Sequence, residues 1–126
     1  MEINLNSDVS TIVQKAEEMA LQFTRDKLKT NQIRNFYSAI TRMRAEYEQY
    51  DDLKTGFERI KSQLIMLKPK LAYAAGRQTA VRANFYPFMT SAIKSIEQAT
   101  DKAKAMENFF LLVESVVAYH KFHGGE

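Results

Sequence analysis

The chain has 126 residues, of which 45% are hydrophobic and 26% are charged, a balance typical of a folded globular protein rather than a disordered one. It contains no cysteine, which excludes disulfide bonds, thiolate nucleophiles and zinc sites with cysteine ligands. No apolar run reaches the ~20 residues of a membrane-spanning helix, and no signal peptide is evident, so we expect one cytoplasmic domain over residues 1–126 with no membrane partner.

Apolar residues recur at spacings of three and four along most of the chain, which is the period of an α-helix. Only four glycines and two prolines interrupt this pattern, and no segment shows the alternation of polar and β-branched or aromatic residues that indicates a strand. The sequence therefore predicts an all-α protein, folded as a compact bundle of about five helices.

The first two helices are predicted from capping residues that precede amphipathic segments. The first is expected to start at Ser7 or Asp8, whose side chains can accept from free amides, and to end near Leu28. The second is expected to begin with Thr30 as its cap. The polar face of this second helix carries Arg34, Ser38 and Arg42.

The third helix is predicted to open at Asp51 and Asp52 and to end at Gly76. Pro69 lies inside it and lacks a backbone donor, so we expect a kink or a short break there. Its apolar positions alternate spacings of four and three, which forms a heptad-like seam that a partner helix could also use. The seam consists of Leu53, Phe57, Ile60, Leu64, Leu67, Leu71 and Ala74.

The last third of the sequence predicts a connector and two further helices. Residues 77–84 are polar enough to be a connector, after which Pro87 can occupy the first turn of a short fourth helix. Thr100 or Asp101 is expected to cap the fifth helix, which is apolar over most of its circumference.

Basic residues are clustered, although the net charge of +3 is small. Phosphate binding requires several cations presented together, because each contact adds only modestly to affinity. We therefore expect contacts with a polyanion backbone, without base stacking, since no aromatic residues alternate with glycine and basic residues as in an RNA-reading sheet. Between Glu58 and Glu97 the acid-free chain carries Arg59, Lys61, Lys68, Lys70, Arg77, Arg82 and Lys94. Between Asp26 and Glu46 it carries Lys27, Lys29, Arg34, Arg42 and Arg44.

The cations of the third helix fall on the two edges of its apolar stripe. An alternative interpretation is that they are solvated flanks whose aliphatic stems cover the core. One edge carries Lys54, Lys61 and Lys68, and the other carries Arg59, Lys70 and Arg77.

Catalytic chemistry finds little support in the sequence. His120 and His123 could form an acid–base pair or supply two metal ligands, but no third ligand has suitable spacing, so we expect structural roles for both. No phosphate-binding loop or nucleophile motif is present. We expect no catalytic residues, no metal site and no cofactor.

Three stretches resemble a known family. They are QIRNFYSAI at 32–40, LKPKLAYAAGR at 67–77 and VESVVAYHKF at 113–122, and together they are similar to the small subunit of type III-A (Csm-type) CRISPR effector complexes. The resemblance implies a non-catalytic, all-helical subunit in antiviral defence that is present in several copies. It also implies that the subunit stacks into an inner filament, contacts guide RNA and target RNA, and binds other subunits of the complex.

Carried onto this sequence, the resemblance implies RNA-backbone contacts by basic residues in the first two stretches, with two further candidates beside them. A second hypothesis remains open, in which the chain is a helical adaptor or regulatory dimer that binds protein helices through the heptad-like seam and does not bind RNA. Self-association, as a dimer or a filament, is expected under both hypotheses. The candidate RNA-binding residues are Arg34, Lys68, Lys70 and Arg77, with Arg42 and Lys61 as additions.

Overall fold

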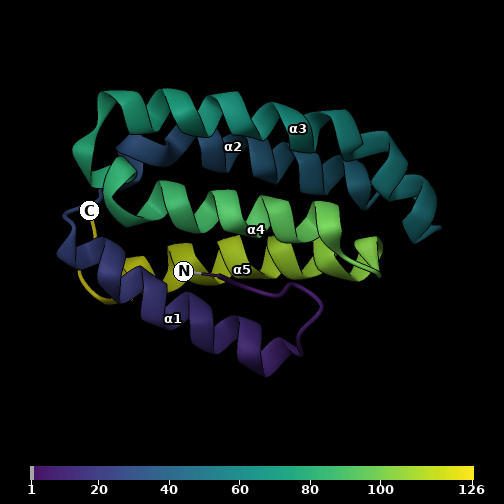
Figure 1. Ribbon diagram of the computed structural model, residues 1–126, viewed down its shortest axis with the longest axis horizontal. Coiled ribbons are helices and arrows are strands. Elements are labelled where there is room, and N and C mark those ends of the chain that lie inside the picture. Colours follow the sequence, from purple (N-terminus) through teal and green to yellow (C-terminus); the bar gives the residue numbers. More distant parts are fainter. Residues whose placement is uncertain (1) are drawn as a thin grey trace.

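The computed structural model describes residues 2–126, which form an α-helical bundle with no β-strand among them (Figure 1). The prediction of an all-α bundle of about five helices is therefore confirmed. The helices are α1 (Val9–Arg25), α2 (Thr30–Tyr47), α3 (Leu53–Arg77), α4 (Tyr86–Gln98) and α5 (Lys102–Phe122), with a π-helical segment, η1 (Val81–Phe85), directly before α4.

The helices are arranged as two pairs with α4 between them (Figure 1). Helices α2 and α3 form a hairpin on one side of the bundle, and α1 packs along α5 on the other. Helix α4 contacts both α3 and α5, so it joins the two pairs. None of the helices within residues 2–126 is both long enough and apolar enough to span a membrane.

One hydrophobic core receives side chains from every helix. Phe85 of η1 is almost fully buried in this core, with its ring 5.2 Å from that of Phe23 on α1 and 5.7 Å from that of Phe36 on α2. Burial of an aromatic side chain of this size contributes roughly 1.5–3 kcal/mol, so Phe85 is a strong link between the N-terminal helix and the α2–α3 hairpin.

Three aspartates cap helices as the sequence predicts. Asp8 accepts from the Thr11 amide at 2.8 Å, Asp52 from the Lys54 amide at 3.2 Å and Asp101 from the Lys104 amide at 3.0 Å. Hydrogen bonds lower the pKa of the Asp8 and Asp52 carboxyl groups below the ordinary value. The largest contribution comes from the Thr11 side chain at Asp8 and from the Thr55 side chain at Asp52. The starts of α1, α3 and α5 are thus fixed by local sequence.

Two predicted boundaries of the first helices are wrong. Helix α1 ends at Arg25 rather than near Leu28, because Lys27 adopts a left-handed conformation (φ 64°) that turns the chain. The cap of α2 is Lys29 rather than Thr30, which is already helical. The Lys29 amide donates to the side chain of Gln32 at 2.9 Å, so a residue inside the helix replaces the expected side-chain cap.

The predicted connector over residues 77–84 is also wrong. Only Gln78 leaves the helical conformation, and the chain is helical again from Thr79 onward. Val81 and Phe85 explain this, because they lie four residues apart and both are buried in the core. Pro87 lies in the first turn of α4, as expected.

Helix α3 continues through Pro69, so the structure shows no break there. Leu67 and Leu71 are buried on either side of the proline, and their packing compensates for the missing backbone hydrogen bond. The helix also runs past Gly76 to Arg77, which corrects the predicted end.

The middle of the heptad-like seam of α3 is buried inside the chain, while Leu53 at its start is 45% exposed. Phe57, Ile60, Leu64, Leu67 and Leu71 are all less than one-tenth exposed and belong to the common core. An adaptor that binds a partner helix through this seam would have to open the bundle, which removes the structural basis of that hypothesis.

Candidate nucleic-acid interface

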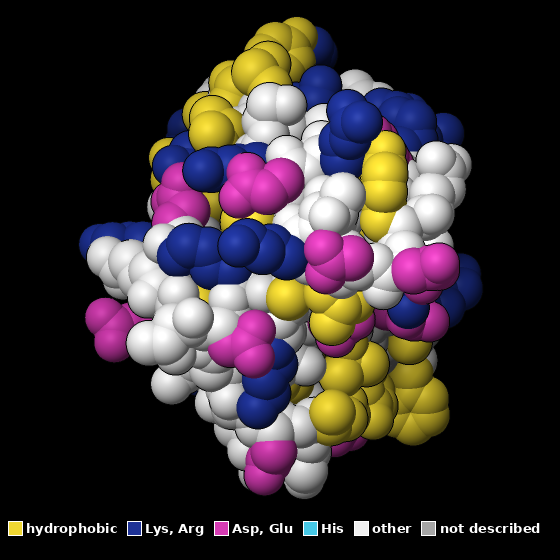
Figure 2. Space-filling model, turned by 90° about the vertical axis from the view of Figure 1, so that its right-hand side faces the viewer, with side chains coloured by type: hydrophobic (Ala, Val, Ile, Leu, Met, Phe, Trp, Pro, Cys, Tyr) yellow, Lys and Arg dark blue, Asp and Glu magenta, His cyan; other side chains and the backbone are white. Residues whose placement is uncertain are grey.

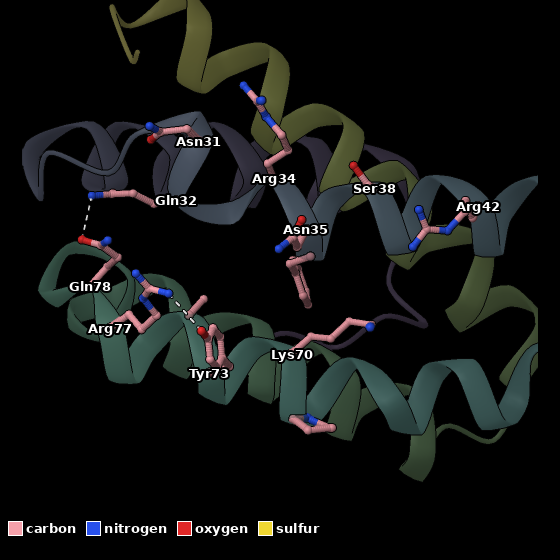
Figure 3. Close-up of a pocket in the computed structure, with 13 residues that line it drawn as sticks. Asn31, Gln32, Arg34, Asn35, Ser38, Arg42, Lys70, Tyr73, Arg77 and Gln78 are labelled. Atoms are coloured by element: carbon pink, nitrogen blue, oxygen red, sulfur yellow. Dashed lines mark hydrogen bonds between the residues drawn. The ribbon is translucent and has the colours of Figure 1, made fainter.

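A hollow with a volume of about 690 Å³ lies between α2 and α3 (Figure 3). We call it the α2–α3 groove. Its floor includes Phe36 and Ala74, and its rims carry mostly polar and basic side chains, without any Asp or Glu. The groove is lined by Asn31, Gln32, Arg34, Asn35, Phe36, Ser38, Arg42, Pro69, Lys70, Tyr73, Ala74, Arg77 and Gln78.

Four of the six predicted RNA-binding residues lie in this groove. Arg34 and Arg42 come from α2, while Lys70 and Arg77 come from α3. Lys70 and Arg77 are seven residues apart, close to two helical turns, so α3 directs both cations to the same side. Arg34 and Arg42 are eight residues apart, so their directions around α2 differ by about 80°. All four side chains are exposed. In Figure 3, Arg42, Lys70 and Arg77 lie beside the space between the two helices, whereas the Arg34 side chain extends from α2 away from α3.

The groove cations are not neutralised within the chain. The ion pairs found within residues 2–126 involve Lys29, Arg44 and Lys68 and none of the four groove cations. Positive charges concentrated in an acid-free hollow attract anions more strongly than the net charge of +3 alone would suggest. The arrangement is therefore suited to binding a polyanion.

The groove has a closed end and an extension. Near the start of α2, the Gln32 side-chain amide donates to Gln78 at 3.2 Å and bridges the two helices (Figure 3). In the other direction, a smaller hollow of about 220 Å³ shares Arg42 and Lys70 with the groove. An elongated ligand could therefore enter from this second side and follow the helix axes.

Tyr73 is a groove residue that the sequence analysis missed. Its side chain is 63% exposed, and its hydroxyl accepts from Nη1 of Arg77 at 2.9 Å (Figure 3). The guanidinium carbon of Arg77 lies 5.6 Å from the ring centre, which is a cation–π contact. The sequence could have indicated this contact, because Tyr73 precedes Arg77 by one helical turn on the polar side of α3.

Lys61 and Lys68 lie away from the groove, on the edge of α3 nearer α4. Lys68 donates to Oε2 of Glu97 on α4 at 2.9 Å, whereas Lys61 is exposed. The structure therefore gathers four of the predicted residues and separates two from them.

At the end of the bundle seen in Figure 2, Lys and Arg side chains are most numerous over the half that α2 and α3 occupy.

His120 has a structural role, as the sequence predicts. It is buried, and its Nε2 lies 2.8 Å from the Leu28 carbonyl oxygen, which ties α5 to the loop after α1. Within residues 2–126, no three His, Asp or Glu side chains are placed to hold a metal ion together.

Comparison with known families identifies the family of the chain. Residues 6–126 match the family model described as Csm2 Type III-A, which covers essentially the whole chain. No curated protein and no solved structure matches. This is a family of structural subunits rather than known catalysts, and its members are parts of multisubunit complexes. The chain therefore belongs to the Csm2 family of small subunits of type III-A CRISPR effector complexes.

Proposed function

We propose that this small subunit binds the sugar–phosphate backbone of guide or target RNA in the α2–α3 groove. The observation that carries the proposal is that one groove without an acidic lining residue is lined by four cations from two helices, Arg34, Arg42, Lys70 and Arg77. Arginine and lysine side chains in such an array neutralise successive phosphates without reading the base sequence.

The number of groove cations sets the expected salt dependence. If all four neutralise phosphates of single-stranded RNA, the logarithm of the binding constant should fall against the logarithm of salt concentration with a slope of about three. A fourfold rise in salt would then weaken binding roughly 50-fold. Measurement of affinity by fluorescence anisotropy over a salt series tests this number directly.

Two charge-reversal double variants test whether RNA binds in the α2–α3 groove. Arg34→Glu/Lys70→Glu changes one cation on each rim of the groove, and we expect it to weaken RNA binding more than about tenfold. Lys54→Glu/Lys61→Glu makes the same change in net charge on the other edge of α3, where both side chains are exposed. This matched control should weaken binding less than about threefold, through the general field alone.

Circular dichroism should show the same helix content in both double variants, since all four substituted side chains are exposed. Equal losses in the two variants would show that only net charge matters, and the groove would then not be the binding site. RNA that co-purifies with the assembled complex provides the second readout, and the groove variant should reduce it selectively.

Self-association and stacking with other subunits form the second part of the proposal. Ile65 and Met66 on α3 are 48% and 54% exposed, and such apolar side chains support protein contacts more readily than RNA contacts. Ile65→Ser should reduce the mass measured by light scattering. Ile65 lines neither the groove nor its extension, so RNA affinity should not change. An unchanged mass would place any contact between copies elsewhere.

A further inference from the structure

We propose that the α2–α3 groove binds RNA with an unpaired nucleotide, whose base stacks on the ring of Tyr73. The inference rests on the proposed function, because the groove cations would hold the phosphates on either side of that nucleotide. It revises the sequence-based expectation of backbone contacts without base stacking, because the exposed ring of Tyr73 lies in the groove. It adds a preference for a class of RNA, since a fully paired duplex keeps its bases inside the helix and offers none to the tyrosine.

Tyr73 lies where a base could reach it. Its ring belongs to the groove lining, yet 63% of the side chain remains exposed. An exposed tyrosine ring does not gain the favourable free energy of burial that usually places aromatic rings in a core. Stacking on a base would bury the ring, and alanine substitutions at such contacts typically lower affinity by about 5- to 150-fold.

Arg77 holds the ring in position for stacking. Its guanidinium is bonded to the Tyr73 hydroxyl at 2.9 Å and lies 5.6 Å from the ring centre. The pair comes from consecutive turns of the continuous helix α3, so its geometry does not depend on a loop. Arg77 can therefore orient the ring and still present donors to a neighbouring phosphate.

The surrounding side chains suit a planar polar ligand. Asn35 points into the space between the helices, and the Gln32–Gln78 hydrogen bond closes the nearby end (Figure 3). Amide groups offer both donors and acceptors to base edges, whereas phosphates accept only. The volume of about 690 Å³ lies within the range of about 300–1,000 Å³ typical of small-molecule sites, so a nucleobase fits together with part of its backbone.

The test compares three RNA probes with the purified full chain at low salt. The first is a fully paired duplex, the second is the same duplex with one bulged nucleotide, and the third carries an abasic residue at the bulge. The wild-type chain should bind the bulged RNA at least about fivefold more tightly than the abasic RNA, because only the former supplies a base. Equal affinities would overturn the inference.

Variants of Tyr73 assign the preference to the ring. Tyr73→Leu should abolish the difference between bulged and abasic RNA, while Tyr73→Phe should retain most of it, since a phenylalanine ring also stacks. A preference that survives Tyr73→Leu would overturn the inference. Misfolding should not be mistaken for a loss of stacking, because the Tyr73 side chain is exposed and its substitution should not unfold the chain. The abasic probe also measures the backbone affinity that each variant retains.

The proposed function fails in a different way. If Arg34→Glu/Lys70→Glu binds all three RNAs as tightly as the wild type, the groove cations do not hold RNA, and both proposals fall. If that variant loses all three RNAs while the wild type ignores the bulged base, the backbone site remains and only the stacking site is wrong.

Discussion

The two edges of α3 carry the same charge but have different surroundings. On one edge, Lys70 and Arg77 face α2 across the groove, opposite further arginines. On the other edge, Lys68 forms an ion pair with Glu97 of α4. Both edges have three basic residues at helical spacing in the sequence, so spacing alone does not distinguish them.

The neighbouring helix decides what a basic edge can do. Helix α2 adds Arg34, Ser38 and Arg42 to the groove lining without any carboxylate, whereas α4 offers a carboxylate to the opposite edge. A lysine already paired with a carboxylate gives up part of its attraction for phosphate, because the two negative groups compete for it. We therefore expect RNA binding to be concentrated on the α2 side.

The largest effect should come from a change that separates α2 from α3. A Cβ atom at Gly56 would lie 3.1 Å from the backbone oxygen of Tyr47, which has little freedom to move. Gly56→Val should therefore cost about 1–3 kcal/mol of stability and weaken RNA binding by disturbing the groove. Chemical denaturation and anisotropy measure the two effects.

Gly76 provides the matched control for this substitution. It lies in the same helix, and a Cβ there meets nothing within 4 Å. Gly76→Val should change stability by less than about 0.5 kcal/mol. Equal losses from both substitutions would show that helix propensity, rather than the close approach of the two helices, is responsible.

The next effect comes from an acid placed in the groove itself. Ser38 lies between Arg34 and Arg42 along α2. Ser38→Glu would therefore give the groove a carboxylate, as Glu97 does for Lys68 on the other edge of α3. We expect RNA affinity to fall about tenfold, which corresponds to about 1.4 kcal/mol. Thr90→Glu, on the exposed side of α4, adds the same charge elsewhere and should lower affinity less than about threefold.

The sequence predicts the fold better than it predicts the site. Asp8, Asp52 and Asp101 act locally, so their capping roles and the helices that they start are evident from the sequence. The helical turn at Val81 and Phe85 was missed because polar neighbours and a following proline outweighed two apolar residues whose burial depends on the whole bundle. The groove could not be predicted for the same reason, since the pairing of Lys68 with Glu97 and the exposure of Tyr73 depend on which helices become neighbours.

A smaller effect concerns the hydroxyl of Tyr47, whose ring packs edge-on against that of Phe110 on α5. Within residues 2–126 this buried hydroxyl has no hydrogen-bond partner, and burial raises its pKa to about 12. Tyr47→Phe should change stability at neutral pH by no more than about 1 kcal/mol, and in the favourable direction.

The raised pKa of Tyr47 also predicts that the stability of the folded chain falls at alkaline pH. Because the folded-state pKa exceeds the ordinary value of 10.0, the neutral phenol is favoured in the folded chain. The contribution of Tyr47 to stability is therefore complete below pH 10 and is lost as pH rises toward about 12. Denaturation curves should show a smaller alkaline loss for Tyr47→Phe, and identical losses in both proteins would contradict the assignment.

The smallest effect tests whether the second edge of α3 can be turned into a binding surface. Glu97→Gln leaves Lys68 without its carboxylate, and since both side chains are more than one-third exposed, the lost ion pair should cost less than about 1 kcal/mol. One freed cation adds at most one phosphate contact, so RNA affinity should rise less than about threefold. A tenfold rise would mean that Glu97 masks a second RNA surface that includes Lys68 and Lys61, and the difference between the two edges would then depend on a single carboxylate rather than on the shape of the groove.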